Sequence, residues 1–333
     1  MRVLKSITLE KISLSASSIA PPIAHFEAPL EAPFHVCRHI RCAAQNLSTI
    51  PDLSTISSDV KSNPRCSARC RLSYARTGQR MNGTVVITGA VSGIGLSTSK
   101  LFLAKGWNVM MADFNEDLGK KVLEELLAEY SPERLAFQQC DVSSARSVDA
   151  MAQATHDSFG HVDSVINNAG IFAKGAVHEI DEDVWDRVMA TDVKSIYLTT
   201  RAFVPEMIER KSGTIVNTAS ISGLQGDYNM AVYNAAKGAV VNLVRAMALD
   251  YGKYGIRVNN VNPGPTMTPM FRSNPQSVID EFAQASPLGR LVQPEDIART
   301  MYFLASDESD PITGQNIPVS AGFEIYSGQP VQD

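Results

Sequence analysis

The stretch TVVITGAVSGIG, residues 84–95, places a short run of β-branched residues directly before three glycines. Such a run is typical of a short buried strand, here at 84–88, and the pattern after the glycines indicates a helix at 94–105. Glycine lets the backbone turn sharply and approach an anion, and the start of a helix offers unpaired N–H groups. The stretch therefore predicts a phosphate site between strand and helix, although a glycine-rich turn alone is weak evidence.

Strands and helices continue to alternate along the chain. We expect further strands at 108–112, 135–140, 163–167, 213–217, 256–260 and near 315–319. We expect helices at 116–130, 145–159, about 183–210, about 233–252 and about 294–305, with an irregular stretch at 263–287. This alternation predicts an α/β domain with a doubly wound parallel sheet, a Rossmann fold, whose ligands bind at the carboxyl ends of the strands. The residues expected at those ends are Gly95, Asp113, Asp141, Asn168, Ser220 and Asn262.

Composition and charge exclude several classes of function. The 333 residues are 44% hydrophobic and 20% charged, an ordinary globular balance. Residues 1–80 hold 11 Lys and Arg against 5 Asp and Glu, and the remainder holds 19 against 30. A domain with this acidic excess is a poor electrostatic match for nucleic acid. No apolar run approaches the roughly 20 residues needed to span a bilayer, so we expect neither a nucleic-acid nor a membrane partner.

Residues 1–80 are rich in Ser, Thr, Pro and Arg and lack sustained periodicity, so we expect a disordered extension before a domain at 81–333. The opening residues have the composition of a transit peptide, which would allow mitochondrial or plastid import. The alternative, which we favour, is that translation begins at Met81 and that the upstream part is a gene-model artefact.

Cysteines are divided unevenly between these two parts. Cys140 is the one cysteine after residue 80, which fits a reducing compartment such as the cytoplasm. The spacing of the four earlier cysteines does not match that of a zinc site, and we expect no bound metal. Those four are Cys37, Cys42, Cys66 and Cys70.

Tyr233 and Lys237 are four residues apart in an Ala-rich segment that reads as a long helix. Side chains at this spacing share one helix face, and a neighbouring cation favours the phenolate form of a tyrosine. Tyr233 is therefore a candidate proton donor and acceptor. An isolated Tyr-x-x-x-Lys pattern recurs by chance, so its interpretation depends on the surrounding signals.

Those signals, taken in order, are the glycine turn, Asp113, Asp141-Val142, Asn168-Ala-Gly170, Ser220, the Tyr-Lys pair and Asn262-Pro-Gly264. From about Asn82 to about Phe323 the chain resembles the short-chain dehydrogenase/reductase family in its shorter form. The resemblance implies that Ser220 orients the substrate oxygen and that Tyr233 transfers the proton. It also implies that Lys237 promotes the phenolate and holds the nicotinamide ribose.

The resemblance implies a nicotinamide dinucleotide, and Asp113 indicates which one. A carboxylate at the end of the second strand can accept hydrogen bonds from the adenosine ribose and would repel a 2′-phosphate, so we expect NAD. The resemblance assigns cofactor contacts to Gly89, Ser92, Gly93, Ile94, Gly95, Asp113, Asp141, Val142, Asn168, Ala169, Gly170, Tyr233, Lys237, Pro263, Gly264, Thr266 and Thr268.

Asp192 departs from the family's pattern, which usually has Asn at this position. The Asn kinks its helix and helps to hold a water in the proton relay from the lysine. Asp preserves an acceptor but cannot donate when ionised, and it adds a negative charge near Lys237. We interpret Asp192 as part of a modified relay in the catalytic set, which could make the enzyme slow.

The leading hypothesis is an NAD-dependent oxidoreductase that interconverts a secondary alcohol and a ketone. The alternatives are a 3-oxoacyl-thioester (acyl-carrier-protein) reductase using NADPH, against which Asp113 argues, and a non-catalytic dinucleotide-binding relative, which only Asp192 favours. Helices 183–210 and 233–252 resemble those through which the family forms dimers and tetramers, so we expect a homotetramer or a homodimer. The expected pocket residues are mostly apolar and indicate a medium-sized, weakly charged substrate. They are Leu224, Gln225, Tyr228, Met270, Phe271 and Phe282.

Overall fold

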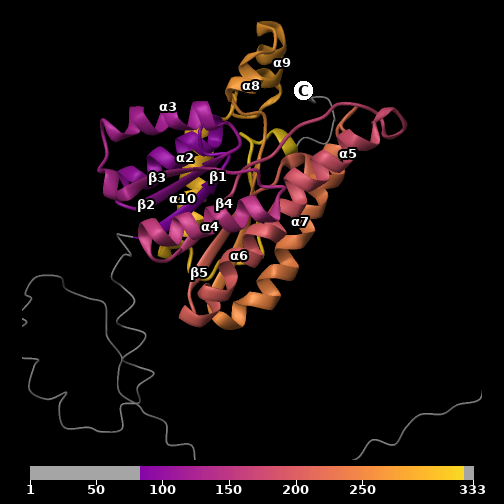
Figure 1. Ribbon diagram of the computed structural model, residues 1–333. Helices are drawn as coiled ribbons and strands as arrows, with labels where there is room; N and C mark the ends of the chain where they lie inside the picture. The colour runs from indigo at the N-terminus through magenta and orange to yellow at the C-terminus, as the bar shows by residue number, and fades with distance from the viewer. Residues whose placement is uncertain (1–82, 326–333) are drawn as a thin grey trace, which may run out of the picture. The chain divides into compact units, whose positions relative to one another are not determined.

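A seven-stranded parallel sheet forms the centre of the computed structural model, which describes residues 83–325 (Figure 1). The strand order is β3-β2-β1-β4-β5-β6-β7, and every neighbouring pair is parallel. This arrangement confirms the doubly wound fold. The expectations for residues 1–80, including the early cysteines and the start at Met81, lie outside the described residues. The strands are β1 (Thr84–Thr88), β2 (Asn108–Asp113), β3 (Leu135–Gln139), β4 (Ser164–Asn167), β5 (Gly213–Thr218), β6 (Ile256–Pro263) and β7 (Asn316–Val319).

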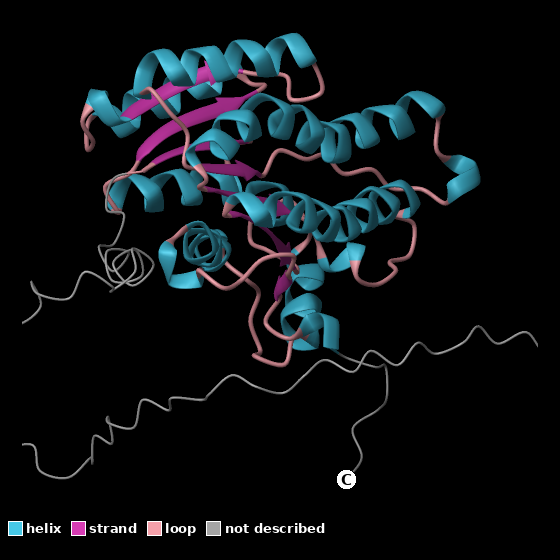
Figure 2. Cartoon of the chain, turned by 90° about the horizontal axis from the view of Figure 1, so that it is seen from below, coloured by secondary structure: helices cyan, strands magenta, loops and turns pink. Residues whose placement is uncertain are grey.

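Helices cover both faces of the sheet, as Figure 2 shows. One face carries α4 (Ala145–Phe159), α6 (Ser195–Arg210) and α7 (Ala231–Tyr251), and the other carries α2 (Gly93–Ala104), α3 (Glu116–Leu127) and α10 (Pro294–Ala305). Successive strand residues point to opposite faces, so Val86 joins the first core while Val85 and Ile87 join the second. Strand β1 is therefore buried on both sides, which explains its continuous apolar run.

A ladder of asparagines fixes the register of four strands. Asn167 donates to Asn217 at 2.8 Å, Asn217 to Asn260 at 3.0 Å, and Asn260 to Asn316 at 2.8 Å. Asn316 then donates to the carbonyl of Val241 on α7 at 3.1 Å. Buried amides that lack partners are costly, so a one-residue slip of any strand would break several hydrogen bonds together. The ladder thereby aligns the ends of β5 and β6.

Two predicted segments were wrong in their interior. The single helix expected at 183–210 is α5 (Glu182–Met189), a π-helical turn η4 (Ala190–Lys194) and α6. The stretch expected to be irregular at 263–287 contains α8 (Pro269–Arg272) and α9 (Gln276–Ala285). Pro269 begins α8 and Pro275 is the N-cap of α9. Proline suits the first turn of a helix because its missing N–H has no intrahelical partner there.

Short 3₁₀ helices connect the main elements. They are η2 (Pro132–Arg134), η3 (Val177–Glu179), η5 (Ile221–Gly223), η6 (Gly252–Tyr254), η7 (Asp307–Ser309) and η8 (Phe323–Ile325). Across residues 83–325, none of the helices combines the length and the apolar character that crossing a bilayer requires.

Candidate active site

The glycine turn between β1 and α2 needs its glycines for different reasons. Gly89 and Gly93 have φ values of +63° and +49°, which L side chains rarely adopt. A Cβ on Gly95 would lie 1.9 Å from the carbonyl oxygen of Gly89, so only glycine fits there. Ser92 caps α2 with extended backbone, and the first turn of α2, which includes Ile94, holds no acidic residue. The turn therefore has the form of an anion site at a helix N-terminus.

Asp113 ends β2 beside this turn. Its carboxylate accepts a hydrogen bond from the Asn115 N–H at 3.0 Å and a longer one from the Val91 N–H at 3.4 Å. The Ala90 N–H donates to the carbonyl of Ala112 at 3.2 Å, which holds the turn against β2. Asp113 is partly exposed, so its carboxylate lies at the rim of the anion site with lone pairs left for a ligand.

The Asp141 carboxylate, unlike that of Asp113, is held by several hydrogen bonds within its own turn. One oxygen of its carboxylate accepts from both the N–H and the hydroxyl of Ser143, at 2.9 and 2.7 Å. Its own N–H donates to Ser147 at 3.0 Å, and the neighbouring Val142 is buried. The side chain of Asp141 makes the hydrogen bonds of a local turn. A ligand could therefore contact the Asp141 backbone and Val142, but not a free Asp141 carboxylate.

Asn168 ties three strands together at their carboxyl ends. Its amide donates to the carbonyls of Thr88 and Gly89, both at 3.1 Å, and its oxygen accepts from Thr218 at 3.2 Å. Ala169 packs against Gly89, where a Cβ would come within 3.0 Å of the Ala169 Cα. The segment after β4 thus fixes the floor of the glycine turn.

Ser220 follows β5 and caps η5. Its Oγ accepts from the Ser222 N–H at 3.1 Å, so its own proton is not used in the cap. The buried amide of Asn262 donates to the Ser220 carbonyl at 2.9 Å and holds this backbone in place. A Cβ on Gly223 would lie 2.5 Å from the carbonyl of Lys237, which places η5 directly against α7.

Tyr233 and Lys237 lie one turn apart on α7, as their spacing predicted. The Lys237 Nζ is 5.6 Å from the centroid of the Tyr233 ring. Lys237 is 4% exposed, whereas Tyr233 is partly exposed and packs edge-on against Phe172 with ring centroids 5.3 Å apart. A buried ammonium beneath an accessible phenol can stabilise negative charge on the phenol oxygen.

Asp192 lies in the π-helical turn η4 and pairs directly with Lys237. The Lys237 Nζ is 3.0 Å from the Asp192 Oδ2 and donates to the Thr218 carbonyl, also at 3.0 Å. The Asp192 Oδ1 accepts from the Ile171 N–H at 2.8 Å. Burial alone would lower the pKa of Lys237, but the Asp192 carboxylate, aided by Tyr233, outweighs burial and raises it. The lysine is therefore held charged.

Gly170 covers this ion pair. A Cβ at Gly170 would lie 3.1 Å from the Asp192 Oδ2 and 3.4 Å from the Lys237 Nζ. Because a glycine stands here, the chain after β4 can pass close over both charges. A π-helical turn within a helix often marks a functional site, and here it supplies the counter-ion of the buried lysine.

The segment after β6 returns to the glycine turn. The Gly264 N–H donates to the carbonyl of Val319 at 3.0 Å, immediately after Pro263 ends β6. The Thr266 hydroxyl donates to the Gly264 carbonyl at 2.7 Å, and Thr268 caps α8. A Cβ on Gly93 would contact the methyl group of Thr268 at 3.2 Å, so this segment closes one side of the site.

Three contributors were missed by sequence reasoning. Phe172 packs on Tyr233, the Thr218 carbonyl accepts from Lys237, and Phe323 packs on Phe282 with ring centroids 5.6 Å apart. Phe172 could have been found, since it follows the Asn-Ala-Gly segment by two residues. The Thr218 and Phe323 contacts join residues far apart in the sequence and leave no local signal.

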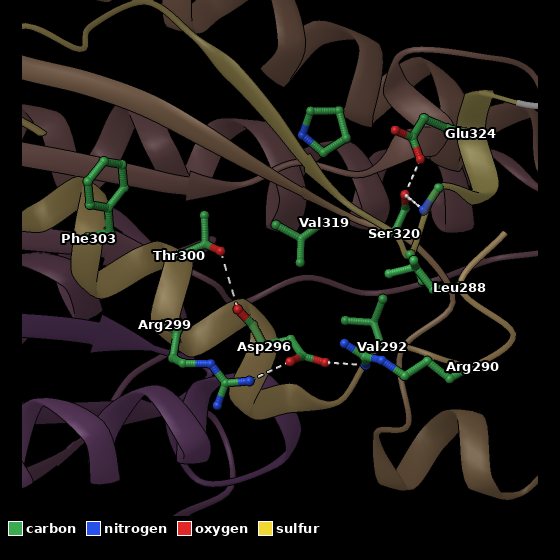
Figure 3. A pocket seen from close by; sticks show the side chains of 13 residues that line it. Leu288, Arg290, Val292, Asp296, Arg299, Thr300, Phe303, Val319, Ser320 and Glu324 are labelled. Carbon is green, nitrogen blue, oxygen red and sulfur yellow. Dashed lines mark hydrogen bonds and ion pairs between the residues drawn. The ribbon is translucent and has the colours of Figure 1, made fainter. Parts of the chain in front are cut away.

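A separate cavity of about 540 Å³ lies between α10, the end of β7 and η8 (Figure 3). Arg290 and Arg299 both pair with Asp296 at its edge, and Ser320 contacts the Glu324 carboxylate. None of the predicted catalytic residues lines this cavity. Its volume alone therefore does not locate the chemistry.

Comparison with known proteins identifies the family. The sequence model of the family described as Enoyl-(Acyl carrier protein) reductase matches residues 89–324. The chain is 41% identical over 249 residues to meso-2,3-butanediol dehydrogenase of Serratia marcescens, covering 75% of this chain and 97% of that protein. The chain belongs to the short-chain dehydrogenase/reductase family. It is accordingly an oxidoreductase acting on CH–OH groups, of a family that binds a nicotinamide dinucleotide.

Two further similarities bear on the subfamily and the fold. The chain is 35% identical over 246 residues to a 3-oxoacyl-(acyl-carrier-protein) reductase of Chlamydia trachomatis, covering 74% of this chain and 99% of that protein. The crystal structure of levodione reductase superposes with a TM-score of 0.70 at 31% identity, covering 73% of this chain and 98% of that chain. The structural similarity agrees with the Rossmann fold described above.

Proposed function

We propose that this protein is an NAD-dependent dehydrogenase that interconverts a secondary alcohol and a ketone. The observation that carries the proposal is the buried Lys237, held charged by Asp192 beneath a partly exposed Tyr233. Burying an ammonium is costly, and this one lies where it can promote loss of the tyrosine proton. The butanediol dehydrogenase, whose named substrate is a secondary alcohol, supports the same class of substrate.

Each catalytic residue has a role that follows from its contacts. The Ser220 hydroxyl accepts from a backbone N–H, so its proton is free to be donated to the substrate oxygen. Tyr233 takes the proton of the alcohol during oxidation and returns it during reduction. Lys237 stabilises the phenolate and holds the nicotinamide ribose. The bound dinucleotide supplies the hydride chemistry, while the protein supplies geometry and charge.

Asp192 acts as the direct counter-ion of Lys237 in this proposal. Its two oxygens are occupied by the Ile171 N–H and the Lys237 ammonium. A direct contact of this kind replaces the water-holding role that the family's Asn has at this position. We infer that Asp192 fixes the position and charge of the lysine.

The dinucleotide would lie along the carboxyl edge of the sheet. The glycine turn and the start of α2 suit the pyrophosphate, because the backbone is open and no acid stands in the first helical turn. Asp113 would accept from the adenosine ribose hydroxyls and disfavour a 2′-phosphate, which supports NAD over NADP. The remaining contacts fall to the segments after β3, β4 and β6, in particular Asp141, Val142, Asn168, Ala169, Gly170, Pro263, Gly264, Thr266 and Thr268.

The substrate is proposed to be of medium size and weakly charged. Phe172 lies against Tyr233, while Leu224 and Met270 are 38% and 66% exposed in the adjoining segments. These apolar side chains favour an apolar substituent on the carbinol carbon. Tyr228, which we expected in the pocket, is 98% exposed.

We also propose that the protein assembles as a homotetramer. Tyr197 on α6 and Leu249 on α7 are 57% and 83% exposed, and Trp185 on α5 is 36% exposed. Apolar residues exposed along neighbouring helices favour an interface between copies. A monomeric mass by light scattering at micromolar concentration would contradict this proposal. A cytoplasmic location is proposed from the scarcity of cysteine after residue 80.

The decisive experiment follows reduced-nicotinamide absorbance with the full-length protein and a panel of secondary alcohols, with NAD and NADP in parallel. Turnover with NAD and little with NADP is the expected result. If absorbance changes with neither NAD nor NADP, although calorimetry shows that the dinucleotide binds, the result would favour the non-catalytic alternative. It would also contradict the assigned catalytic roles.

A second candidate function is reduction of a 3-oxoacyl thioester with NADPH. The 35% identity to the Chlamydia trachomatis reductase favours it, and Asp113 argues against it by charge. An acetoacetyl thioester offered with NADPH separates the two candidates, since the leading proposal expects slow or no oxidation of NADPH.

A further inference from the structure

The loop that follows β5 begins at Ser220 and runs to Asp227, and we call it the serine loop. Ile221 is buried, but every residue from Leu224 to Asp227 is exposed. A segment that buries so little of its surface opens easily unless hydrogen bonds hold it. Polar contacts therefore have a large part in fixing the serine loop, and with it the hydroxyl of Ser220.

Ser222 links the Ser220 hydroxyl to helix α7. The Ser222 N–H donates to the Ser220 Oγ at 3.1 Å, and the Ser222 carbonyl accepts from the side-chain amide of Asn234 at 2.5 Å. Both groups belong to one residue of the short helix η5. A displacement of the Ser222 carbonyl would therefore also move the N–H that orients the Ser220 hydroxyl.

The Asn234 amide also reaches further along the serine loop. It donates to the Gln225 carbonyl at 3.0 Å and lies 3.3 Å from the Asp227 Oδ2. An asparagine amide has two N–H donors, and its shorter contacts here are to backbone carbonyls. Asn234 is the residue after Tyr233 on α7. One side chain thus fastens the loop of the substrate-orienting serine to the helix of the proton donor.

Two further contacts hold the backbone on either side of Ser222. The Asn262 amide donates to the Ser220 carbonyl at 2.9 Å. A Cβ on Gly223 would lie 2.5 Å from the Lys237 carbonyl, so this residue lies directly against α7. These contacts act on the neighbours of Ser222, whereas Asn234 acts on Ser222 itself.

We propose that Asn234 is a positioning residue that holds the Ser220 hydroxyl in place relative to Tyr233. In the proposed reaction both groups must meet the same substrate oxygen, Ser220 as a hydrogen-bond donor and Tyr233 as the group that transfers the proton. A misplacement of about 1 Å in such an arrangement can lower turnover by about 100-fold. This inference rests on the proposed alcohol and ketone chemistry and adds to it a residue that acts through Ser220.

The test is a double-mutant cycle in the full-length protein, with Asn234→Leu and Ser220→Ala made singly and together. Leucine has the branched shape of asparagine but no N–H donor, so it releases the Ser222 and Gln225 carbonyls. For an alcohol that the wild type oxidises, we expect Asn234→Leu to lower kcat by about 100-fold, with little change in the affinity for NAD measured by calorimetry.

The cycle shows whether this loss passes through Ser220. The factor by which Ser220→Ala lowers kcat should be at least about tenfold smaller in the Asn234→Leu background than in the wild type, because the serine is already misplaced there. If the two effects simply multiply, Asn234 does not act through Ser220 and the proposal is overturned. Asn234→Ser, which keeps one donor, carries the same cycle should the leucine variant fail to fold.

Asn108→Leu is the matched control for the loss of a hydrogen bond elsewhere in the domain. Asn108 begins β2, at the end of the strand away from the candidate active site, and its amide donates to the Thr84 hydroxyl at 3.3 Å. This variant should leave kcat and the effect of Ser220→Ala unchanged. A loss of kcat as large as that with Asn234→Leu would contradict a local positioning role.

Hydrogen–deuterium exchange gives a readout that does not require turnover. The backbone amides of residues 222–225 should exchange faster in Asn234→Leu than in the wild type, while exchange in α3 should not change. Unaltered exchange in the serine loop overturns the proposal even where kcat falls. If the wild type oxidises no alcohol, the proposed function fails, and the exchange result still decides whether Asn234 holds the serine loop.

Discussion

Asp192→Asn is the perturbation that tests the buried ion pair most directly. Asparagine has nearly the same size and can still accept from the Ile171 N–H through Oδ1, so the π-helical turn should persist. The change removes the negative charge 3.0 Å from the Lys237 Nζ. At an effective dielectric constant near 20, two unit charges at that separation attract by about 5–6 kcal/mol.

The measured loss should be smaller than this attraction. Removing one partner of a buried pair typically costs about 3–5 kcal/mol, and because one hydrogen bond is retained we expect this variant to lose about 3 kcal/mol of unfolding free energy at pH 7. In the wild type the pKa of Lys237 is raised above its ordinary value of 10.5, so its stabilisation is complete below that pH and is lost only above it.

In the variant, the Asp192 charge no longer opposes the effect of burial, which favours the neutral amine. The pKa of Lys237 should therefore fall below 10.5. The unfolded chain then binds more protons than the folded chain at moderately alkaline pH, and the stability of the variant rises with pH. The gap between the wild type and the variant should therefore shrink from pH 7 to pH 10. Urea unfolding at several pH values measures this gap.

Asp149→Asn is the matched control, because its partner Arg201 is exposed and 2.6 Å away. Its effect should be much smaller and independent of pH over the same range. A stability loss with Asp192→Asn that equals the control, or one that does not change with pH, would refute the assignment of Asp192 as the counter-ion.

Three further predictions concern turnover and the cofactor. Tyr233→Phe should abolish turnover while calorimetry shows unchanged NAD binding, and residual activity near the wild-type rate would exclude Tyr233 as the proton donor. Asp113→Ser should raise the ratio of kcat/KM with NADP to that with NAD by about tenfold or more, since about 1.4 kcal/mol of removed repulsion suffices; an unchanged ratio would mean that Asp113 does not select. Gly95→Ala should weaken dinucleotide binding and lower the free energy of unfolding by more than about 1–3 kcal/mol, because its Cβ would lie 1.9 Å from the Gly89 oxygen.

The order of strands and helices was predictable because each element buries one regular face. The strand at 84–88 and the helices at 145–159 and 294–305 have the predicted bounds. The π-helical turn was not predictable, since the apolar pattern runs through 183–210 and one extra residue per turn barely disturbs it. The helices α8 and α9 were missed because they are only four and ten residues long, and such short segments show little of the apolar periodicity that predicts a helix.

The positions of the candidate site residues along helices and strands were predictable, but their contacts were only partly so. The spacing of Tyr233 and Lys237 placed them on one face of a helix, and the structure has them there. The expectation for Asp192 was a negative charge near Lys237, without the direct 3.0 Å contact. The direct contact depends on η4 lying against α7, a tertiary arrangement that a local pattern does not encode.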